Sequence, residues 1–247
     1  MLTIAVPMAG SSSFYPEADN TYPKLFREVL GKPMIQAVVE NLMTIDTPKR
    51  FIFIVNQTDV SKFKLDNVLQ MLTNNQCDIV VQTAPTKGAV CSLLLAVKSL
   101  NHDTPLLITN SDQIIDHDLN EIVNYFLNPN LDGAVVCFDS VHPQWSYAGL
   151  VNGDQLAEAA EKQPISRNAI AGMYFFKKGT DFIQSSINSI LKDRNYMGKY
   201  YTSSVLNEMI LENKNLKIFN IKSTEYHSFY TPEKIGEYEQ MIKDKKL

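Results

Sequence analysis

The sequence has no long stretch of positive charge. Its 23 Lys and Arg residues are outnumbered by 27 Asp and Glu, which leaves a formal net charge of −4 and an isoelectric point of about 5.6. A protein that binds a nucleic-acid backbone usually carries a basic stripe or patch. We therefore expect no nucleic-acid partner, although a few lysines and backbone N–H groups are enough to hold a small nucleotide.

Long apolar runs are missing as well. No stretch reaches the roughly 20 residues that a membrane-spanning helix needs, so we expect no membrane association. The first ten residues, MLTIAVPMAG, contain no basic leader, and Pro7 interrupts their apolar part. This segment predicts a first strand and not a signal peptide.

Cysteine is sparse. Three cysteines occur, widely spaced and each in or beside an apolar segment, at Cys77, Cys91 and Cys137. Their number and placement indicate reduced, buried thiols in a cytoplasmic protein. No Cys/His cluster has the spacing of a zinc site.

A repeated strand–helix pattern organises the first half of the chain. Short β-rich apolar runs predict strands at 2–7, 50–56, 78–82, 105–109 and 133–138. Apolar residues at helical spacing predict helices at 33–42, 60–72, 87–100 and 119–127. Such units, joined by short connections, predict an α/β fold with a doubly wound, mostly parallel or mixed central sheet flanked by helices. In these sheets the ligand crevice lies beyond the carboxyl ends of the strands.

The second half has shorter strands and more turns. We expect strands at 146–151, 155–161, 170–176 and 217–221, and helices at 182–191, 202–212 and 232–243. No linker, internal repeat or low-complexity stretch divides the chain, so residues 1–247 are predicted to form a single domain. The later part is expected to form a lid or a substrate lobe on the same sheet.

The turn after the first strand is the first candidate site. Gly10 and the serines Ser11, Ser12 and Ser13 allow backbone N–H groups to approach phosphate oxygens closely, and Lys24 adds a cation. The same residues also suit an ordinary loop with serine caps.

A carboxylate follows the predicted strand 105–109. Asp112, in the run Asn110-Ser111-Asp112-Gln113, is expected to project from the carboxyl edge of the sheet, where it could hold Mg²⁺. A turn or cap role is the alternative. Asp116 and Asp118 lie close by, and we expect at least one of them to cap a helix.

Two further lysine-containing turns are candidates for phosphate contacts. Lys87-Gly88-Ala89 opens a predicted helix with small residues, which leave room for a base or a phosphate. Lys162 precedes a turn with Pro164 and could meet a substrate phosphate as a point charge. Taken alone, the first is more often a tight strand-to-helix turn, and the second a solvated surface lysine.

Taken in order, these segments resemble the sugar-phosphate nucleotidyltransferase family, the nucleoside-diphosphate-sugar pyrophosphorylases. The signature loop and first helix of that family are similar to Pro7-Met8-Ala9-Gly10, Pro23-Lys24 and Gly31-Lys32-Pro33-Met34-Ile35. Later matches are Gly88-Ala89, residues 106–113, residues 145–150, Glu161-Lys162 with Pro164, residues 172–176 and Thr231-Pro232-Glu233. The resemblance spans nearly the whole chain.

The resemblance implies a Rossmann-like nucleotidyltransferase fold and the synthesis of a nucleotide sugar, as used in polysaccharide biosynthesis. A phosphate oxygen of a phosphorylated small molecule, expected to be a sugar phosphate, attacks the α-phosphorus of a nucleoside triphosphate. Pyrophosphate leaves, while Mg²⁺ and lysines neutralise the phosphates. Residues 1–140 would bind the nucleotide, and residues 141–247 would bind the acceptor and supply closing helices.

The same resemblance assigns roles to single residues. The implied catalytic residues are Lys24, Asp112 and Lys162, with Asp112 as the metal ligand. The implied nucleotide-binding residues are Ala9, Gly10, Ser11, Ser12, Ser13, Gln82, Gly88, Ala89 and Ser111. The implied acceptor-binding residues are Tyr147, Gly149, Glu161, Lys162 and Gly172.

Two positions depart from the family pattern. Phe14 stands where the family usually has an Arg in the signature loop, which leaves Lys24 as the expected main cation. Ser228 stands where a second metal-binding Asp is common, with Glu225 and His227 as the nearby residues able to replace it.

Two other functions stay open at this point. One is a glycosyltransferase with a related sheet, although Asn110-Ser111-Asp112 lacks the first carboxylate of a metal-binding Asp pair. The other is a non-catalytic nucleotide-binding protein. The sequence identifies neither the base nor the acceptor, and it leaves open whether copies of the chain form a homo-oligomer.

Overall fold

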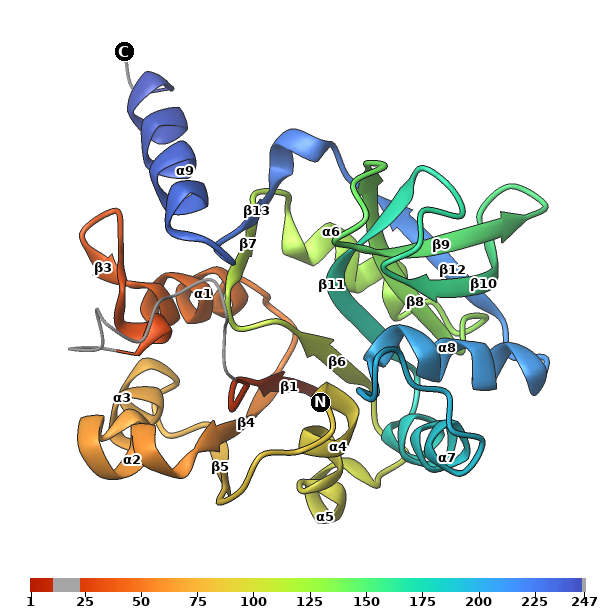
Figure 1. Cartoon of the computed structure of the whole chain (residues 1–247), viewed down its shortest axis with the longest axis horizontal. Helices are drawn as coiled ribbons and strands as arrows, with labels where there is room; N and C mark the ends of the chain where they lie inside the picture. The colour runs from red at the N-terminus through yellow and green to blue at the C-terminus, as the bar shows by residue number, and fades with distance from the viewer. Residues whose placement is uncertain (11–22, 246–247) are drawn as a thin grey trace.

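The computed structural model describes residues 1–10 and 23–245. The chain forms a mixed sheet with helices on both faces (Figure 1). The nine strands follow the order β5-β4-β1-β6-β11-β8-β12-β10-β9. Their bounds are β1 Leu2–Pro7, β4 Lys49–Asn56, β5 Cys77–Gln82, β6 Leu106–Thr109, β8 Gly133–Asp139, β9 Ser146–Val151, β10 Gln155–Glu161, β11 Asn168–Phe176 and β12 Leu216–Asn220. The α/β class and the mixed sheet predicted from the sequence are confirmed.

The sheet has a parallel half and a largely antiparallel half. Strands β5, β4, β1 and β6 run parallel, as expected for strands joined through helices. Beyond them β11 is antiparallel to both β6 and β8, and β9 is antiparallel to β10, whereas β12 is parallel to β8. Ala169 of β11 also pairs with Tyr147 of β9, which brings the last strand in the order back onto β11.

Alternate side chains of β1 enter two separate cores. Ile4 and Val6 belong to the core under α1 (Met34–Met43), α3 (Leu65–Leu72) and α6 (Leu119–Phe126). Ala5 belongs to the core under α4 (Ala89–Leu94), α7 (Gly179–Leu191) and α8 (Thr202–Leu211). This alternation is the period of two that a strand covered on both faces requires, and it confirms the doubly wound arrangement.

Two predicted helices are each divided in the structure. The helix predicted at 60–72 is α2 (Gln57–Phe63) followed by α3, because Lys64 between them has a φ of +55°. The helix predicted at 87–100 is α4 followed by α5 (Val97–Leu100), with non-helical torsions at Ala96. Both predictions were wrong about continuity, since apolar spacing alone does not register a single residue that leaves the helical region.

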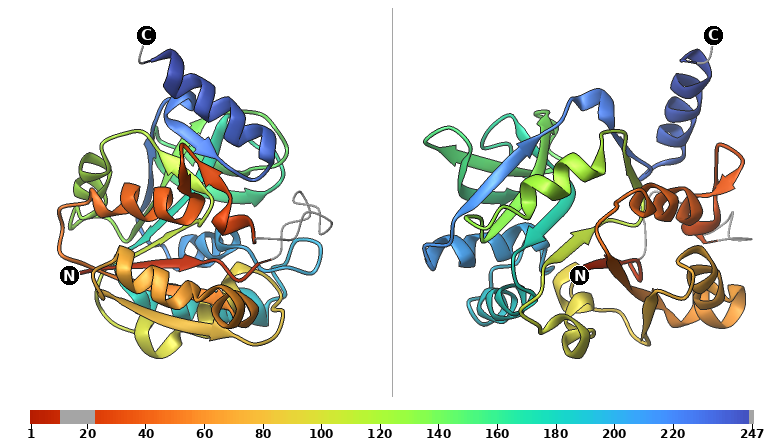
Figure 2. Two further views of the ribbon diagram at one scale, coloured as in Figure 1. Left: turned by 90° about the vertical axis from the view of Figure 1, so that its left-hand side faces the viewer. Right: turned by 180° about the vertical axis from the view of Figure 1, so that it is seen from behind.

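Several short elements were not predicted. They are β2 (Glu28–Val29), β3 (Lys32–Pro33), β7 (Gln113–Ile115), β13 (Tyr226–Ser228) and the 3-10 turns η2 (Lys24–Phe26) and η3 (Ser223–Glu225). The last helix, α9 (Pro232–Asp244), lies beside the β2–β3 pair, where the Leu30 N–H donates to Glu239 at 2.8 Å. Figure 2 shows this helix projecting from the body of the molecule. Within residues 1–10 and 23–245, none of the helices combines the length and apolarity needed to cross a bilayer.

Candidate active site

The site is built at the point where the strand order reverses. Strand β1 has β4 on one side and β6 on the other, so the connections leaving its neighbourhood diverge at the carboxyl ends of β1 and β6, which is where sheets of this kind usually form their ligand crevice. Met8, Ala9 and Gly10 follow β1 directly, and the turn with Asp112 follows β6. The predicted position of Asp112 at the carboxyl edge of the sheet agrees with this topology.

Lys24 and Asp112 meet in this crevice. The Lys24 Nζ lies 2.5 Å from the Asp112 Oδ2, and the two side chains are only 18% and 24% exposed. Lys24 is placed by the 3-10 turn η2, which begins immediately after Pro23. Both residues were predicted as site residues from the sequence, but their direct contact, across 88 positions of the chain, could not be predicted from their spacing.

The strand pair β7–β13 fixes the turn that carries Asp112. The Phe229 N–H donates to the Asp112 carbonyl at 2.7 Å, and Ser228 pairs in register with Gln113. Ser228 is therefore adjacent to the Asp112 turn, where the family pattern has a second carboxylate.

Glu225 and His227, the two residues considered as replacements, have other partners. The Glu225 carboxylate accepts from the Lys222 N–H at 2.7 Å, which lowers the Glu225 pKa, and it lies 3.3 Å from the His117 Nδ1. The ring of His227 packs on Tyr238 with 4.7 Å between ring centroids, and burial lowers the pKa of His227. Neither contact supports a role as a metal ligand beside Asp112.

A network of amide and hydroxyl groups supports the Asp112 turn. The Gln113 side chain donates to the Thr109 hydroxyl at 3.2 Å and accepts from the Tyr226 hydroxyl at 3.2 Å. The Asn110 N–H donates to the Gly172 carbonyl at 3.2 Å, and a Cβ on Gly172 would lie 2.1 Å from the Asn110 Nδ2. Sequence reasoning missed these supporting roles, because Asn110 and Tyr226 meet Gln113 and Gly172 only through the tertiary fold.

Three of the predicted nucleotide-binding residues, Gln82, Gly88 and Ala89, lie around the end of β5 and the start of α4. Gln82 is buried and accepts from the Ser92 hydroxyl at 2.7 Å. Gly88 has a φ of +105°, and a Cβ there would lie 2.5 Å from the Tyr200 carbonyl oxygen. Ala89 begins α4, and Ser111 lies in the Asp112 turn.

The serine run of the signature loop lies outside the described residues. The undescribed residues 11–22 include Ser11, Ser12, Ser13 and Phe14. Their predicted roles, including the effect of Phe14 in place of an Arg, stay predictions.

The predicted acceptor-binding residues lie on β9, β10 and β11. Glu161 is largely buried and accepts from the Ser146 hydroxyl and, at 2.8 Å, from the Ser203 hydroxyl. Burial raises the pKa of Glu161, and the two serine hydrogen bonds oppose that change. Lys162 follows with a φ of +53°, and its N–H donates to the Trp145 carbonyl at 3.0 Å.

Two other residues predicted to bind the acceptor have structural contacts. Tyr147 is buried, and its hydroxyl donates to the His142 carbonyl at 2.7 Å. A Cβ on Gly149 would lie 3.1 Å from Ile165, so this glycine allows close packing. Acceptor binding by these residues stays a prediction, and the hydroxyl of Tyr147 is already engaged.

The carboxylate of Asp112 suits a magnesium ion that binds together with substrate phosphates. In the part of the chain that the structure describes, no three His, Cys, Asp or Glu residues gather as a metal site. Mg²⁺ is commonly held by one or two carboxylates together with substrate phosphates. Asp112 at the crevice supplies such a carboxylate, so the donor set suits Mg²⁺ and not a metal with a complete set of protein ligands.

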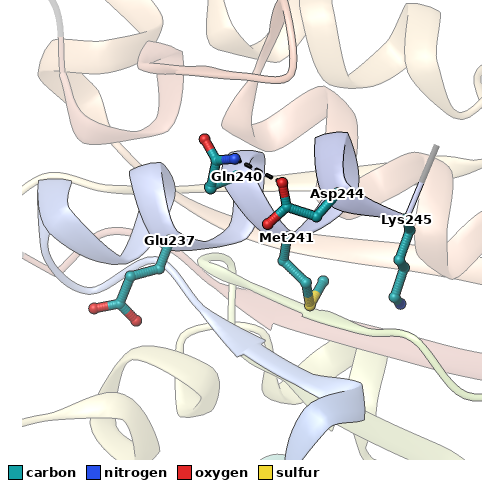
Figure 3. A pocket seen from close by; sticks show the side chains of 5 residues that line it. All are labelled: Glu237, Gln240, Met241, Asp244 and Lys245. Carbon is teal, nitrogen blue, oxygen red and sulfur yellow. Dashed lines mark hydrogen bonds between the residues drawn. The ribbon is translucent and has the colours of Figure 1, made fainter. Parts of the chain in front are cut away.

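Two surface cavities are lined by residues other than Lys24 and Asp112. One of about 640 Å³ is lined by four residues of α9 and by Lys245, which follows the helix; Figure 3 shows them: Glu237, Gln240, Met241, Asp244 and Lys245. The other, of about 530 Å³, lies between α9 and the β8–β9 connection, with Trp145 and Ser228 among its lining residues. Neither cavity is lined by Lys24 or Asp112, so cavity shape does not locate the candidate site.

Comparison with known families identifies the chain. The family model for nucleotidyl transferases matches residues 9–224, which is most of the sequence. The chain belongs to the nucleotidyl transferase family. The matched range includes Lys24, Asp112 and Lys162, so the family and the enzyme class predicted from the order of motifs are confirmed.

Solved structures of other nucleotidyl transferases share the fold along nearly their whole length. A nucleoside-diphosphate-sugar pyrophosphorylase from Vibrio cholerae RC9 superposes with a TM-score of 0.81 at 22% identity, over 96% of this chain and 99% of that one. A UDP-glucose pyrophosphorylase solved with UDP-glucose gives 0.77 at 16% identity, over 98% of each chain. The inositol-1-phosphate CTP transferase of T. maritima gives 0.73 at 13% identity, over 94% and 90%. At these identities the likeness establishes the fold, which agrees with the predicted nucleotidyltransferase fold.

Proposed function

We propose that this nucleotidyl transferase transfers a nucleoside monophosphate from a nucleoside triphosphate to a sugar phosphate or a similar small phosphate ester. The observation that carries the proposal is the Lys24–Asp112 pair at the carboxyl ends of β1 and β6. It combines a cation for phosphate oxygens with a carboxylate for a metal in a partly buried place, where charge interactions are stronger than in water. The structural relatives named for UDP-glucose and inositol 1-phosphate support a phosphorylated polyol as the acceptor class.

The residues of the crevice have distinct tasks in this reaction. A phosphate oxygen of the acceptor forms a bond to the α-phosphorus, and the bond from that phosphorus to the bridging oxygen of pyrophosphate breaks. Lys24 donates to the phosphate oxygens on which negative charge accumulates. Asp112 would hold Mg²⁺, which neutralises charge on the triphosphate and on the leaving pyrophosphate.

The acceptor side is organised around Lys162. Its ammonium would donate to the acceptor phosphate as a point charge. Glu161 fixes the end of β10 to Ser146 of β9 and Ser203 of α8, so the backbone that leads into Lys162 is held from two sides. Holding both phosphates in fixed positions supplies much of the catalysis in a reaction of this type.

The three cysteines support a reducing, cytoplasmic environment for the enzyme. Cys77, Cys91 and Cys137 are free thiols, and burial raises the pKa of each one. Raised thiol pKa values make these cysteines poor nucleophiles, so they take no part in the proposed transfer.

A pyrophosphate-release screen tests the proposal. Each of the four common triphosphates is combined with a panel of sugar phosphates and inositol phosphates in the presence of Mg²⁺. We expect release with one preferred pair, and a nucleotide-linked product of matching mass. Pyrophosphate release from no pair, while nucleotides still stabilise the protein against heat, would contradict the proposal and favour a non-catalytic nucleotide-binding protein.

A further inference from the structure

The segment between α7 and α8, residues 192–201, contacts both candidate substrate sites. On the nucleotide side, the Tyr200 N–H donates to the Lys87 carbonyl at 2.7 Å, and the Val90 N–H donates to the Tyr200 carbonyl at 3.3 Å. On the acceptor side, the rings of Tyr196 and Tyr201 face Lys162. The proposed division into a nucleotide-binding part, residues 1–140, and an acceptor-binding part, residues 141–247, assigns no role to a segment that contacts both sites.

This segment is fixed by its own contacts. The Tyr200 hydroxyl donates to Asp193 at 2.8 Å, and the Gly198 N–H donates to the Asn195 side chain at 2.8 Å. At its beginning Lys192 donates to Glu208 of α8 at 2.6 Å. The segment therefore presents its two tyrosine rings from a defined backbone.

The ammonium of Lys162 lies against both rings. Its Nζ is 5.9 Å from the centroid of the Tyr196 ring and 5.7 Å from that of Tyr201, within the range of about 6 Å in which cations are attracted to aromatic faces. The two rings stand edge to face, with 6.4 Å between their centroids. These contacts favour one position for a long side chain that is exposed to solvent.

The backbone of Lys162 is also constrained. Its φ of +53° is uncommon for a residue with a side chain, and such torsions persist where surrounding contacts determine them. Here the contacts are the hydrogen bond to the Trp145 carbonyl and the hydrogen bonds of the partly buried Glu161 just before it. Backbone and side chain are therefore both set before any ligand contact.

We propose that Tyr196 and Tyr201 are positioning residues, which hold the Lys162 ammonium where the acceptor phosphate binds. The inference rests on the proposed function, since it takes the acceptor to be a phosphate ester. An ammonium has three donor hydrogens, so contact with the rings leaves donors for a phosphate. Holding the side chain in advance reduces the ordering that acceptor binding would otherwise require.

Nuclear magnetic resonance on the protein alone tests the contact. Lysines are labelled by reductive ¹³C-methylation, which keeps their charge, and the Lys162 signal is assigned by its loss in Lys162→Arg. We expect ring currents to shift this signal from that of an exposed lysine. The shift should persist in Tyr196→Phe/Tyr201→Phe, which keeps both rings, and disappear in Tyr196→Leu/Tyr201→Leu. An unshifted signal, or a shift retained in the Leu variant, would overturn the proposal.

Kinetics with the substrate pair from the screen test the role. The Leu double variant should raise the acceptor KM by about 3- to 10-fold, and the Phe double variant should stay near the parent. The triphosphate KM should change much less in either variant. An equal rise in both KM values would mean a general structural role and would overturn the proposal.

The two arms separate this inference from the proposed function. If no substrate pair turns over, the proposed function fails, and inorganic phosphate becomes the probe. Phosphate should then perturb the Lys162 signal at lower concentration in the parent and the Phe variant than in the Leu variant. Equal phosphate dependence in all three proteins would overturn the positioning role.

Discussion

The two halves of the sheet present their charged residues by different means. In the parallel half, Lys24 and Asp112 approach from separate turns and meet as an ion pair at the strand ends. In the antiparallel half, Lys162 has aromatic rings as neighbours, and the partly buried Glu161 beside it accepts hydrogen bonds from two serines. Strand topology thus brings Lys24 and Asp112 together in the first half, whereas side-chain packing places Lys162 in the second.

Removing the carboxylate proposed to hold the metal should have the largest effect. Asp112→Asn keeps the size of the side chain and abolishes its charge, so we expect kcat to fall by at least about 100-fold in Mg²⁺-dependent pyrophosphate release. Asp116→Asn is the matched control, since Asp116 is a neighbouring acid paired with Lys245 on the surface. Similar losses in both variants would show that the effect is not specific to the crevice.

Adding a side chain at Gly172 should lower the stability of the fold more directly than the catalytic rate. Its φ is +59°, and an added Cβ would overlap Asn110 and the Gln113 side chain beneath the Asp112 turn. We expect Gly172→Ala to lower the free energy of unfolding by about 1–3 kcal/mol in urea denaturation. Gly153→Ala is the control, since Gly153 also has a positive φ but has no atom within 4 Å of an added Cβ. A loss in Gly172→Ala no greater than in the control would mean that the network under Asp112 is not tightly packed.

The smallest effect concerns pH and the antiparallel half. Burial raises the pKa of Glu161 above its ordinary value of 4.5. The folded state therefore binds this proton more tightly, so the contribution of Glu161 to stability is present below pH 4.5 and is lost as pH rises through the folded pKa. Glu161→Gln should thus gain thermal stability relative to the parent as the pH rises from 4.5 through the folded pKa of Glu161. A difference in melting temperature that stays constant with pH would contradict the raised pKa.

The sequence predicted elements well where the pattern was local. The bounds predicted for the strands 2–7, 146–151 and 155–161 agree with β1, β9 and β10, because turn residues flank each of these apolar runs. The break at Lys64 was not predictable, since a lysine with positive φ leaves no mark in apolar spacing. The pair β7–β13 was missed because three residues carry too little periodicity.

The candidate site divides in the same way. The order of short motifs along the chain led to the prediction of Lys24, Asp112 and Lys162 as site residues. Their partners were not predictable, because the Lys24–Asp112 contact and the tyrosine rings beside Lys162 join residues far apart in sequence. Such contacts depend on the assembled sheet and have no local pattern.

The most direct test of two separate phosphate sites is a crossed measurement of KM. Once the screen has identified a substrate pair, KM for each substrate is determined in Lys24→Ala and Lys162→Ala. Losing one charge-assisted contact costs about 1.5–3 kcal/mol, which corresponds to roughly 10- to 100-fold. We expect Lys24→Ala to weaken mainly the use of the triphosphate, and Lys162→Ala to raise mainly the KM for the acceptor. If each variant changes the KM values of both substrates equally, or if Lys162→Ala changes neither KM value, the division of the site into a nucleotide half and an acceptor half is wrong.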